Sequence, residues 1–241
     1  MKTWVVADIH GESQKLQQAF RNTPINHGDR IIFLGDYVDR GIDSFGVIDF
    51  IIGLKKYYEV ITLKGNHDEV FMNSLLSGIW QFWEQGQRET LDSYIKNCSP
   101  KMTLSDSCGF RWNDLPIPHQ DFFSTLQSYY QDDLGNLFVH GGINRHLSLD
   151  EQSDNIFLWD RDLLNAARSF HYSTSSRDGY PFKILTKDVK RIYVGHTPVQ
   201  YFKKNTPQKY GPVTVLDLGA GKYTDGRVCF YDISTNVYFT N

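Results

Sequence analysis

Residues 31–41 read IIFLGDYVDRG, a short apolar run that ends directly in glycine and charged side chains. The first four residues are β-branched, aromatic or aliphatic, which is typical of a buried strand, and Gly35 permits a sharp turn after it. Asp36 follows that turn at once. The stretch therefore predicts a strand that places a carboxylate at its carboxyl end.

The same order of residues recurs in four more apolar runs that lead into polar side chains and glycine, at 5–7, 60–63, 137–139 and 192–194. Amphipathic patterns over 13–21 and 44–56 predict helices between the first three runs, with Ser13 as a helix N-cap. Alternating strands and helices indicate an α/β fold with a parallel sheet. Because reactive groups collect at the carboxyl ends of parallel strands, we expect the polar clusters to share one cleft.

The middle and the end of the chain have different patterns. Residues 73–133 are helical in pattern, rich in aromatic side chains and interrupted by proline, which predicts a helical cap over the sheet edge with Trp80 and Trp83 in its core. No linker separates this segment, so we expect residues 1–241 to form a single domain. Three β patterns near the end predict a closing antiparallel meander over 213–217, 227–232 and 237–239.

Composition excludes several classes of protein. Hydrophobic residues make up 40% of the 241 residues, enough for a core without disulfide bonds, and the net charge of -3 gives no attraction to nucleic acid or anionic membrane. The three cysteines, Cys98, Cys108 and Cys229, are too scattered for a disulfide framework and favour a reducing compartment. The short apolar run at the start already contains Asp8, which is unlike a signal peptide, so we expect a cytoplasmic protein.

Six polar side chains stand at the ends of the predicted strands: Asp8, His10, Asp36, Asn66, His140 and His196. Each alone is consistent with a helix cap or an ordinary turn, whereas the ordered set favours one site. Carboxylate, imidazole and amide ligands suit manganese, iron(II), zinc or magnesium. Two neighbouring divalent ions need a carboxylate between them, and Asp36 is the candidate for that position. Such a pair can hold a phosphoryl group and a shared hydroxide.

The ordered motifs resemble the signature of the phosphoprotein phosphatase family, within the calcineurin-like metallophosphoesterases, and most of all its bacterial and phage serine/threonine branch. They are Asp8-x-His10, Gly35-Asp36-x-x-Asp39-Arg40-Gly41, Gly65-Asn66-His67-Asp68, His140-Gly141-Gly142 and Gly195-His196-Thr197. The resemblance runs from Asp8 to Ala220. It implies a layered β-sheet sandwich flanked by helices, with a helical cap insertion.

The resemblance also implies the ligands of two metal ions. The first ion would be held by Asp8 and His10, with Asp36 as the bridge. The second ion would be held by three further residues, Asn66, His140 and His196. Manganese is the expected metal, and iron(II), zinc and magnesium suit the same ligands.

Five residues acquire roles in binding and catalysis from the same resemblance. His67 corresponds to the general acid and Asp39 to the carboxylate that orients it, while Arg40, Arg161 and Asn66 would bind the substrate phosphate. A proton donor assists departure of an alkoxide, a carboxylate favours a charged imidazole, and guanidinium groups match phosphoryl oxygens. The alternative for His67 is a further metal ligand or a bystander.

The implied activity is removal of phosphate from phosphoserine, phosphothreonine or phosphotyrosine in proteins, by direct attack of a hydroxide that bridges the two metals. The alternative is a symmetrical dinucleoside tetraphosphate hydrolase, but relatives of that enzyme usually carry Ala-Arg in place of Asp39-Arg40. A non-catalytic phosphate-binding protein on the same fold would lack a ligand or the acid, and none is missing here.

Two positions depart from related patterns. Pro198 stands where broader calcineurin-like nucleases and cyclic-nucleotide phosphodiesterases usually place a second histidine, which argues against those branches. Leu218 replaces the threonine of the family's Asp-Thr-Gly-Ala string, so we expect the loop at 217–220 to line the pocket differently.

Overall fold

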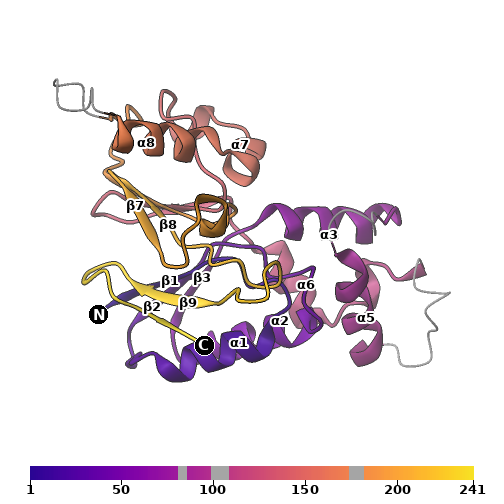
Figure 1. The fold of residues 1–241 in the computed structure, drawn as a ribbon. Coiled ribbons are helices and arrows are strands. Elements are labelled where there is room, and N and C mark those ends of the chain that lie inside the picture. Colours follow the sequence, from indigo (N-terminus) through magenta and orange to yellow (C-terminus); the bar gives the residue numbers. More distant parts are fainter. Residues whose placement is uncertain (81–85, 99–108, 174–181) are drawn as a thin grey trace.

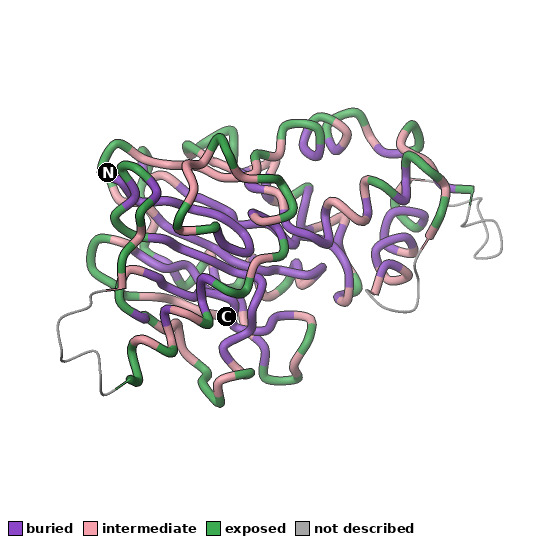
Figure 2. The backbone as a smooth tube through the Cα atoms, turned by 90° about the horizontal axis from the view of Figure 1, so that it is seen from above, coloured by how far each residue is buried: buried purple, intermediate pink, exposed green. Residues whose placement is uncertain are grey.

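A computed structural model describes residues 1–80, 86–98, 109–173 and 182–241 (Figure 1). Two five-stranded sheets face each other, with strand orders β10-β9-β1-β2-β3 and β4-β5-β6-β8-β7. Helices flank the two sheets, and buried residues fill the space between these layers (Figure 2). The predicted layered α/β sandwich is therefore confirmed.

The first sheet contains the three early strands, β1 (Thr3–Val6), β2 (Arg30–Phe33) and β3 (Glu59–Thr62), which are parallel. β9 (Cys229–Asp232) runs antiparallel to β1, and β10 (Tyr238–Thr240) runs antiparallel to β9. The helices α1 (Ser13–Asn22) and α2 (Ser44–Leu54) separate the three parallel strands in the chain.

The second sheet has a parallel centre of β5 (Asn136–Val139), β6 (Arg191–Val194) and β8 (Val213–Val215). Its antiparallel edges are β4 (Tyr129–Gln131) and β7 (Gln208–Tyr210). The predicted closing meander is right for its last two strands, since β9 and β10 pair antiparallel, and wrong for its first, because β8 pairs with β6 while β9 pairs with β1 in the other sheet. An apolar run of this length predicts a strand but does not encode which strand will pair with it.

The apolar run of β2 is continuous because both of its faces are buried. Ile31 and Phe33 pack in the cluster beneath the helices, whereas Ile32 and Leu34 pack in the cluster between the sheets. Phe138 of β5 reaches the same inter-sheet cluster. All five side chains are fully buried, so both layers of the core contact the strand that carries Asp36 at its end.

The two early helices confirm the predicted apolar faces, with Leu16 of α1 and Ile48 of α2 fully buried. The prediction of Ser13 as a cap is wrong, since Glu12 occupies the N-cap position of α1 and makes no side-chain cap bond. The Ser13 hydroxyl instead donates to Asp43, whose carboxylate also accepts from Gly46 N at 3.0 Å and caps α2.

The described part of the segment 73–133 contains the end of α3 (Asn66–Ser77), then α5 (Gln87–Cys98), η2 (Trp112–Asp114) and α6 (Ile117–Ser124). α5 packs against α2, and Trp80 packs against the core cluster beneath the helices. The segment also contains strand β4, which the helical prediction missed. Trp83 and Cys108 lie outside the described residues, and the role of the segment as a cap stays a prediction.

Helices connect the strands of the second sheet. Between β5 and β6 lie η3 (Leu149–Glu151), α7 (Asp154–Trp159) and α8 (Asp162–Tyr172), and between β6 and β7 lies η5 (Val199–Phe202). In Figure 1, α7 and α8 lie on the side of this sheet that faces away from the first sheet. Among the described residues, no helix combines the length and the apolar character that crossing a membrane requires.

Asp29 yields a prediction about stability. Its buried carboxylate accepts from Lys2 N at 2.8 Å, Asn26 N at 3.0 Å and Trp4 Nε1 at 3.2 Å, tying the start of β1 to the approach of β2. Burial opposes the charge, but these donors hold the pKa of Asp29 below its usual value. The Asp29→Ala variant should therefore lose about 1–3 kcal/mol of unfolding free energy at pH 7.

The pKa of Asp29 is lower in the folded state than in the unfolded state. The stabilisation by its carboxylate is therefore fully present above about pH 4 and disappears as the pH falls through the folded-state pKa. Urea denaturation at pH 7 and pH 3 checks this, with Asp29→Asn as the isosteric control. An equal difference between wild type and Asp29→Ala at both pH values would contradict the assignment.

Candidate metal centre

The six predicted metal ligands meet where strands from both sheets end. Four of them follow β1, β2 and β3 of the first sheet, and two follow β5 and β6 of the second sheet. All are at most 7% exposed: Asp8, His10, Asp36, Asn66, His140 and His196. The parallel strands of each sheet place their carboxyl ends at one edge, and the packing of the two sheets brings both edges together.

Backbone strain is concentrated at this meeting point. Among non-glycine residues, Asp8, His10, Asp36 and His196 have left-handed φ values of 32°, 48°, 55° and 63°. The amides of Ile9 and His10 both donate to the Asp36 carbonyl at 2.9 Å, which fixes the loop after β1 against the loop after β2. Neighbouring backbone thus enforces conformations that these residues rarely adopt alone.

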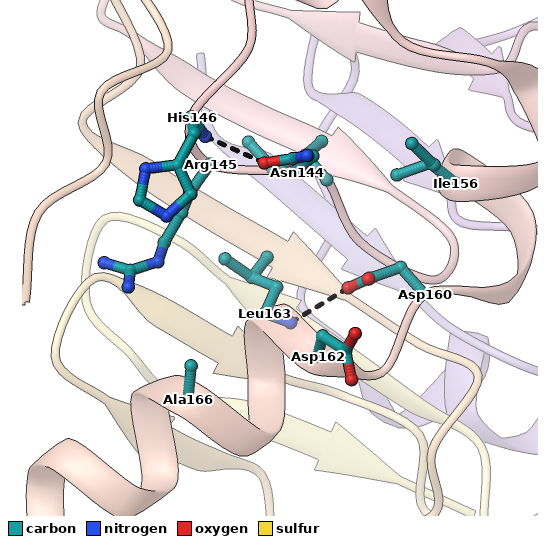
Figure 3. Close-up of a pocket in the computed structure, with 9 residues that line it drawn as sticks. Asn144, Arg145, His146, Ile156, Asp160, Asp162, Leu163 and Ala166 are labelled. Carbon is teal, nitrogen blue, oxygen red and sulfur yellow. Dashed lines mark hydrogen bonds between the residues drawn. The ribbon is translucent and has the colours of Figure 1, made fainter.

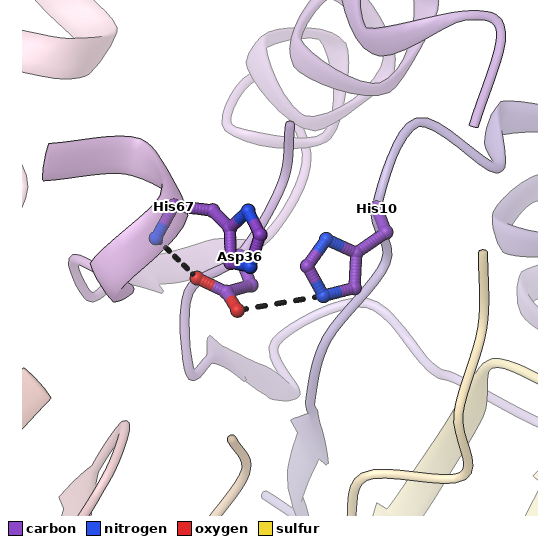
Figure 4. A group of neighbouring side chains, drawn as sticks. All are labelled: His10, Asp36 and His67. Carbon is purple, nitrogen blue, oxygen red and sulfur yellow. Dashed lines mark hydrogen bonds and ion pairs between the residues drawn. The ribbon is translucent and has the colours of Figure 1, made fainter. Parts of the chain in front are cut away.

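The first group of side chains consists of His10, Asp36 and His67 (Figure 4). His10 Nδ1 lies 2.8 Å from the Val38 carbonyl and must donate to it, which leaves His10 Nε2 as an acceptor. That nitrogen faces Asp36 Oδ2 at 3.4 Å and Asp8 Oδ2 at 4.0 Å. Arg40 Nη1 lies 2.5 Å from the same nitrogen and donates to it, so a cation faces these buried acceptor atoms, as a bound metal ion also would.

The second group consists of Asp36, His140 and His196, with Asn66 among them. His140 Nδ1 donates to the Leu34 carbonyl at 3.0 Å, so its Nε2 faces Asp36 Oδ2 at 3.4 Å and Asn66 Oδ1 at 2.9 Å. Asn66 Oδ1 also lies 2.9 Å from His196 Nδ1. Asp36 belongs to both groups, which is the position that sequence analysis predicted for it.

The electrostatics of the centre favour positive charge beside Asp36. Burial opposes ionisation of Asp36, but the neighbouring imidazoles, His140 above all, outweigh it and hold the pKa of this carboxyl well below its usual range. Burial likewise opposes the charge of His140, yet Asp36 and Asp8 raise the pKa of His140 to about 9. A divalent cation can supply the same positive charge in place of the proton.

His67 and Asp39 form a pair beside the ligands. His67 Nδ1 lies 2.7 Å from Asp39 Oδ2, and His67 Nε2 lies 2.9 Å from Arg40 Nη2. Because Nε2 accepts from the guanidinium, Nδ1 carries the proton and donates to Asp39. On α5, Thr90 Oγ1 donates to the other Asp39 oxygen at 3.1 Å and accepts from Asp39 N at 2.7 Å. The helical segment therefore helps to fix the orientation of His67.

A small cavity of about 160 Å³ opens onto this centre. Six predicted site residues line it: Asp36, Arg40, Asn66, His67, Arg161 and His196. Trp159, Pro198 and Lys222 complete the wall, and the Trp159 ring contacts His196 edge-on with centroids 5.9 Å apart. Both predicted arginines thus reach the same polar cavity, whose volume suits a phosphoryl group.

The neighbours of Arg161 line a different and larger cavity of about 450 Å³ (Figure 3). Asp160 and Asp162 form one side of it, and the loop from Asn144 to His146 forms the other. Asp160 Oδ2 accepts from Leu163 N at 3.0 Å, at the start of α8. None of the six predicted metal ligands lines this cavity, whereas three of them line the smaller one.

Asp68 ends the motif Gly65-Asn66-His67-Asp68, and no role was predicted for it from the sequence. Its fully buried carboxylate accepts from Asp36 N and Gly65 N at 2.8 Å and from Tyr37 N at 3.0 Å. Asp68 therefore ties the loop after β2 to the loop after β3. In the sequence, the position of Asp68 directly after His67 was the feature that could have indicated a role at the site.

Asp217 was also missed. It is a buried carboxylate whose pKa is raised to about 6, mainly by burial.

Solved structures of other proteins share this fold. The chain superposes on a candidate diadenosine tetraphosphatase with a TM-score of 0.64 and 16% identity, covering 100% of this chain and 92% of the other. It superposes on a protein serine/threonine phosphatase from Saccharomyces cerevisiae with a TM-score of 0.58 and 15% identity, covering 100% and 79%.

Sequence comparison identifies the family. The serine/threonine-protein phosphatase BSL2 of Arabidopsis thaliana is 27% identical over 160 residues, which is 63% of this chain and 14% of that longer protein. The sequence profile of the calcineurin-like phosphoesterases matches residues 1–200, a range that contains all six of the predicted metal ligands. The chain belongs to the calcineurin-like phosphoesterase family.

Proposed function

We propose that this protein is a two-metal phosphomonoesterase that removes phosphate from phosphoserine and phosphothreonine side chains of proteins. The observation that carries the proposal is the position of Asp36. It belongs to both groups of candidate ligands, at a cavity whose wall also contains Arg40 and Arg161. Metal ligands and phosphate-binding cations therefore converge on one small volume.

The residues present fit two divalent ions. Asp8, His10 and Asp36 would hold one ion, and Asp36, Asn66, His140 and His196 would hold the other. Their donor atoms are buried oxygens and nitrogens, which suit manganese, iron(II), zinc or magnesium. In this structure Arg40 Nη1 lies 2.5 Å from His10 Nε2, so a cation already faces that ligand atom. An ion bound by His10 would displace the guanidinium toward the cavity.

When bound, two divalent ions polarise a water molecule and the phosphoryl oxygens. The chain supplies the other functions. Arg40 and Arg161 would bind the phosphoryl oxygens and hold the ester in place. His67, held by Asp39 through Nδ1, would take up a proton at Nε2 once Arg40 turns to the phosphoryl group, and would donate that proton to the leaving oxygen. Trp159 would exclude water from one side of the cavity.

Two features favour a phosphoprotein substrate over a dinucleotide. The Arabidopsis relative is a serine/threonine-protein phosphatase, although the match covers a small part of it. Asp39 stands where relatives of the dinucleoside tetraphosphate hydrolase usually carry alanine, and here it contacts His67 directly. The structural likeness to a candidate diadenosine tetraphosphatase makes symmetrical cleavage of a dinucleoside tetraphosphate the second candidate.

A side-by-side assay separates the two candidates. We expect the metal-stripped, manganese-reloaded protein to release phosphate from phosphoserine and phosphothreonine peptides and to leave diadenosine tetraphosphate intact. A protein kept free of metal with chelator is the control. Preferential cleavage of the dinucleotide would be consistent with the proposed metal centre but would reject the phosphoprotein substrate.

The role of His67 predicts a dependence on the leaving group. His67→Asn should retain both metals but lose about 10²–10⁴-fold in kcat on alkyl phosphates, because alkoxides need a proton to depart. The loss should be smaller with p-nitrophenyl phosphate, whose phenolate leaves without help. Metal content measured alongside the rates is the control for His67 as a ligand. Equal losses on both esters, or loss of a metal, would reject the assignment as general acid.

A further inference from the structure

The rim of the small cavity contains a lysine that sequence analysis did not single out. Two loops form this rim, one around η5 and one at residues 217–223. They are joined by three hydrogen bonds, from Val199 N to the Asp217 carbonyl at 3.0 Å, from Gln200 Nε2 to the Leu218 carbonyl at 2.8 Å, and from Lys222 Nζ to the Tyr201 hydroxyl at 2.7 Å. The loops thus hold Lys222 and Tyr201 as a pair.

The loop that carries Lys222 packs directly on the candidate metal centre. Gly221 has a left-handed φ of 67°, and a Cβ built there would lie 2.8 Å from His10 Cβ and 3.3 Å from Arg40 Cβ. Only glycine allows this approach. Leu218, which departs from the family's threonine, is buried in the core of the second sheet. The residue of this loop that lines the cavity is therefore Lys222.

Three cationic side chains, Arg40, Arg161 and Lys222, line the same cavity. Within the described part of the chain, none of them forms an ion pair with an aspartate or glutamate. The ammonium of Lys222 lies 4.7 Å from the centroid of the Tyr201 ring in addition to its hydrogen bond. Tyr201 therefore orients this cation without neutralising it.

The number of cations exceeds what one phosphoryl group requires. Arg40 and Arg161 would donate hydrogen bonds to its oxygens, and two bound metal ions would coordinate them. Lys222 belongs to the exposed rim of the cavity, whereas Asn66 and His67 are buried. Its position suits a part of the substrate that lies beside the scissile phosphate.

We propose that Lys222, oriented by Tyr201, binds a second anionic group of the substrate, adjacent to the phosphate that is removed. This inference rests on the proposed function of the cavity as a phosphomonoester site. In a phosphopeptide, the second group is the carboxylate of an aspartate or glutamate beside the phosphorylated residue. The protein then selects phosphorylated residues in acidic surroundings.

Small ligands test the inference without turnover. 3-Phosphonopropionate and propylphosphonate differ by a carboxylate in place of a methyl group, and their P–C bond cannot be hydrolysed, so their binding to the manganese-reloaded protein is measured by calorimetry. We expect wild type to bind 3-phosphonopropionate roughly three- to tenfold more tightly, as for a charge-assisted contact in a partly exposed cleft. The preference should disappear in Lys222→Gln and weaken in Tyr201→Phe. It should also decrease with added salt.

Lys204→Gln is the matched control, because it removes the same charge from the neighbouring exposed loop without lining the cavity. It should retain the full preference for 3-phosphonopropionate. A preference that persists in Lys222→Gln would place the carboxylate on another group, such as a metal ion, and would overturn the proposal. Equal affinity of wild type for both ligands would overturn it as well.

Matched phosphoserine peptides with glutamate or glutamine beside the phosphoserine extend the test to substrates. Wild type should show a higher kcat/KM for the glutamate peptide than for the glutamine peptide, and this ratio should fall to about one in Lys222→Gln. Absence of peptide turnover, with the small-ligand preference intact, would reject the phosphoprotein substrate but keep the anion site. Equal turnover of both peptides by wild type, together with equal binding of the two small ligands, would reject the anion site at Lys222 but keep the phosphoprotein substrate.

Discussion

The structure depends on burial of the Asp36 carboxylate between two sets of imidazole side chains. A buried charge is costly unless hydrogen bonds and opposite charge compensate it. Asp36 Oδ1 accepts from His67 N at 2.9 Å, and Oδ2 faces His10 and His140 at 3.4 Å. Those histidines are fixed by backbone carbonyls on their far sides, so their free nitrogens converge on the carboxylate. Two divalent ions would complete this arrangement by separating the converging acceptor atoms.

Neither sheet can build the centre alone. The first sheet places Asp8, His10, Asp36 and Asn66, while the second places His140 and His196, and apolar packing between the sheets fixes their distance. The centre is further stiffened by left-handed residues and by the Asp68 carboxylate, which accepts three backbone amides from adjoining loops. The stability of the core is thereby coupled to the geometry of the ligands, as preorganised catalysis requires.

Much of the fold and most of the site are visible in the sequence, for identifiable physical reasons. Buried parallel strands need apolar runs, and chemistry at their ends needs polar residues next to glycine, so the ligand positions could be predicted. Pairing partners are not local, which is why the pairing of β8 with β6 instead of β9 was missed. Asp68 and Thr90 act through backbone and side-chain contacts formed only on folding. Lys222 resembles any exposed lysine until the packing of Gly221 places it beside the cavity.

The measurement that tests the central claim most directly is the metal content of wild type and Asp36→Asn after manganese reconstitution, with folding of both verified by circular dichroism. The Asp36 carboxylate is inferred to be shared by two ions, and an amide at this position cannot compensate their mutual repulsion. Wild type should bind two manganese ions per chain, and the variant should bind no more than one. Two ions retained in Asp36→Asn, or only one in wild type, would contradict the shared carboxylate on which the account is built.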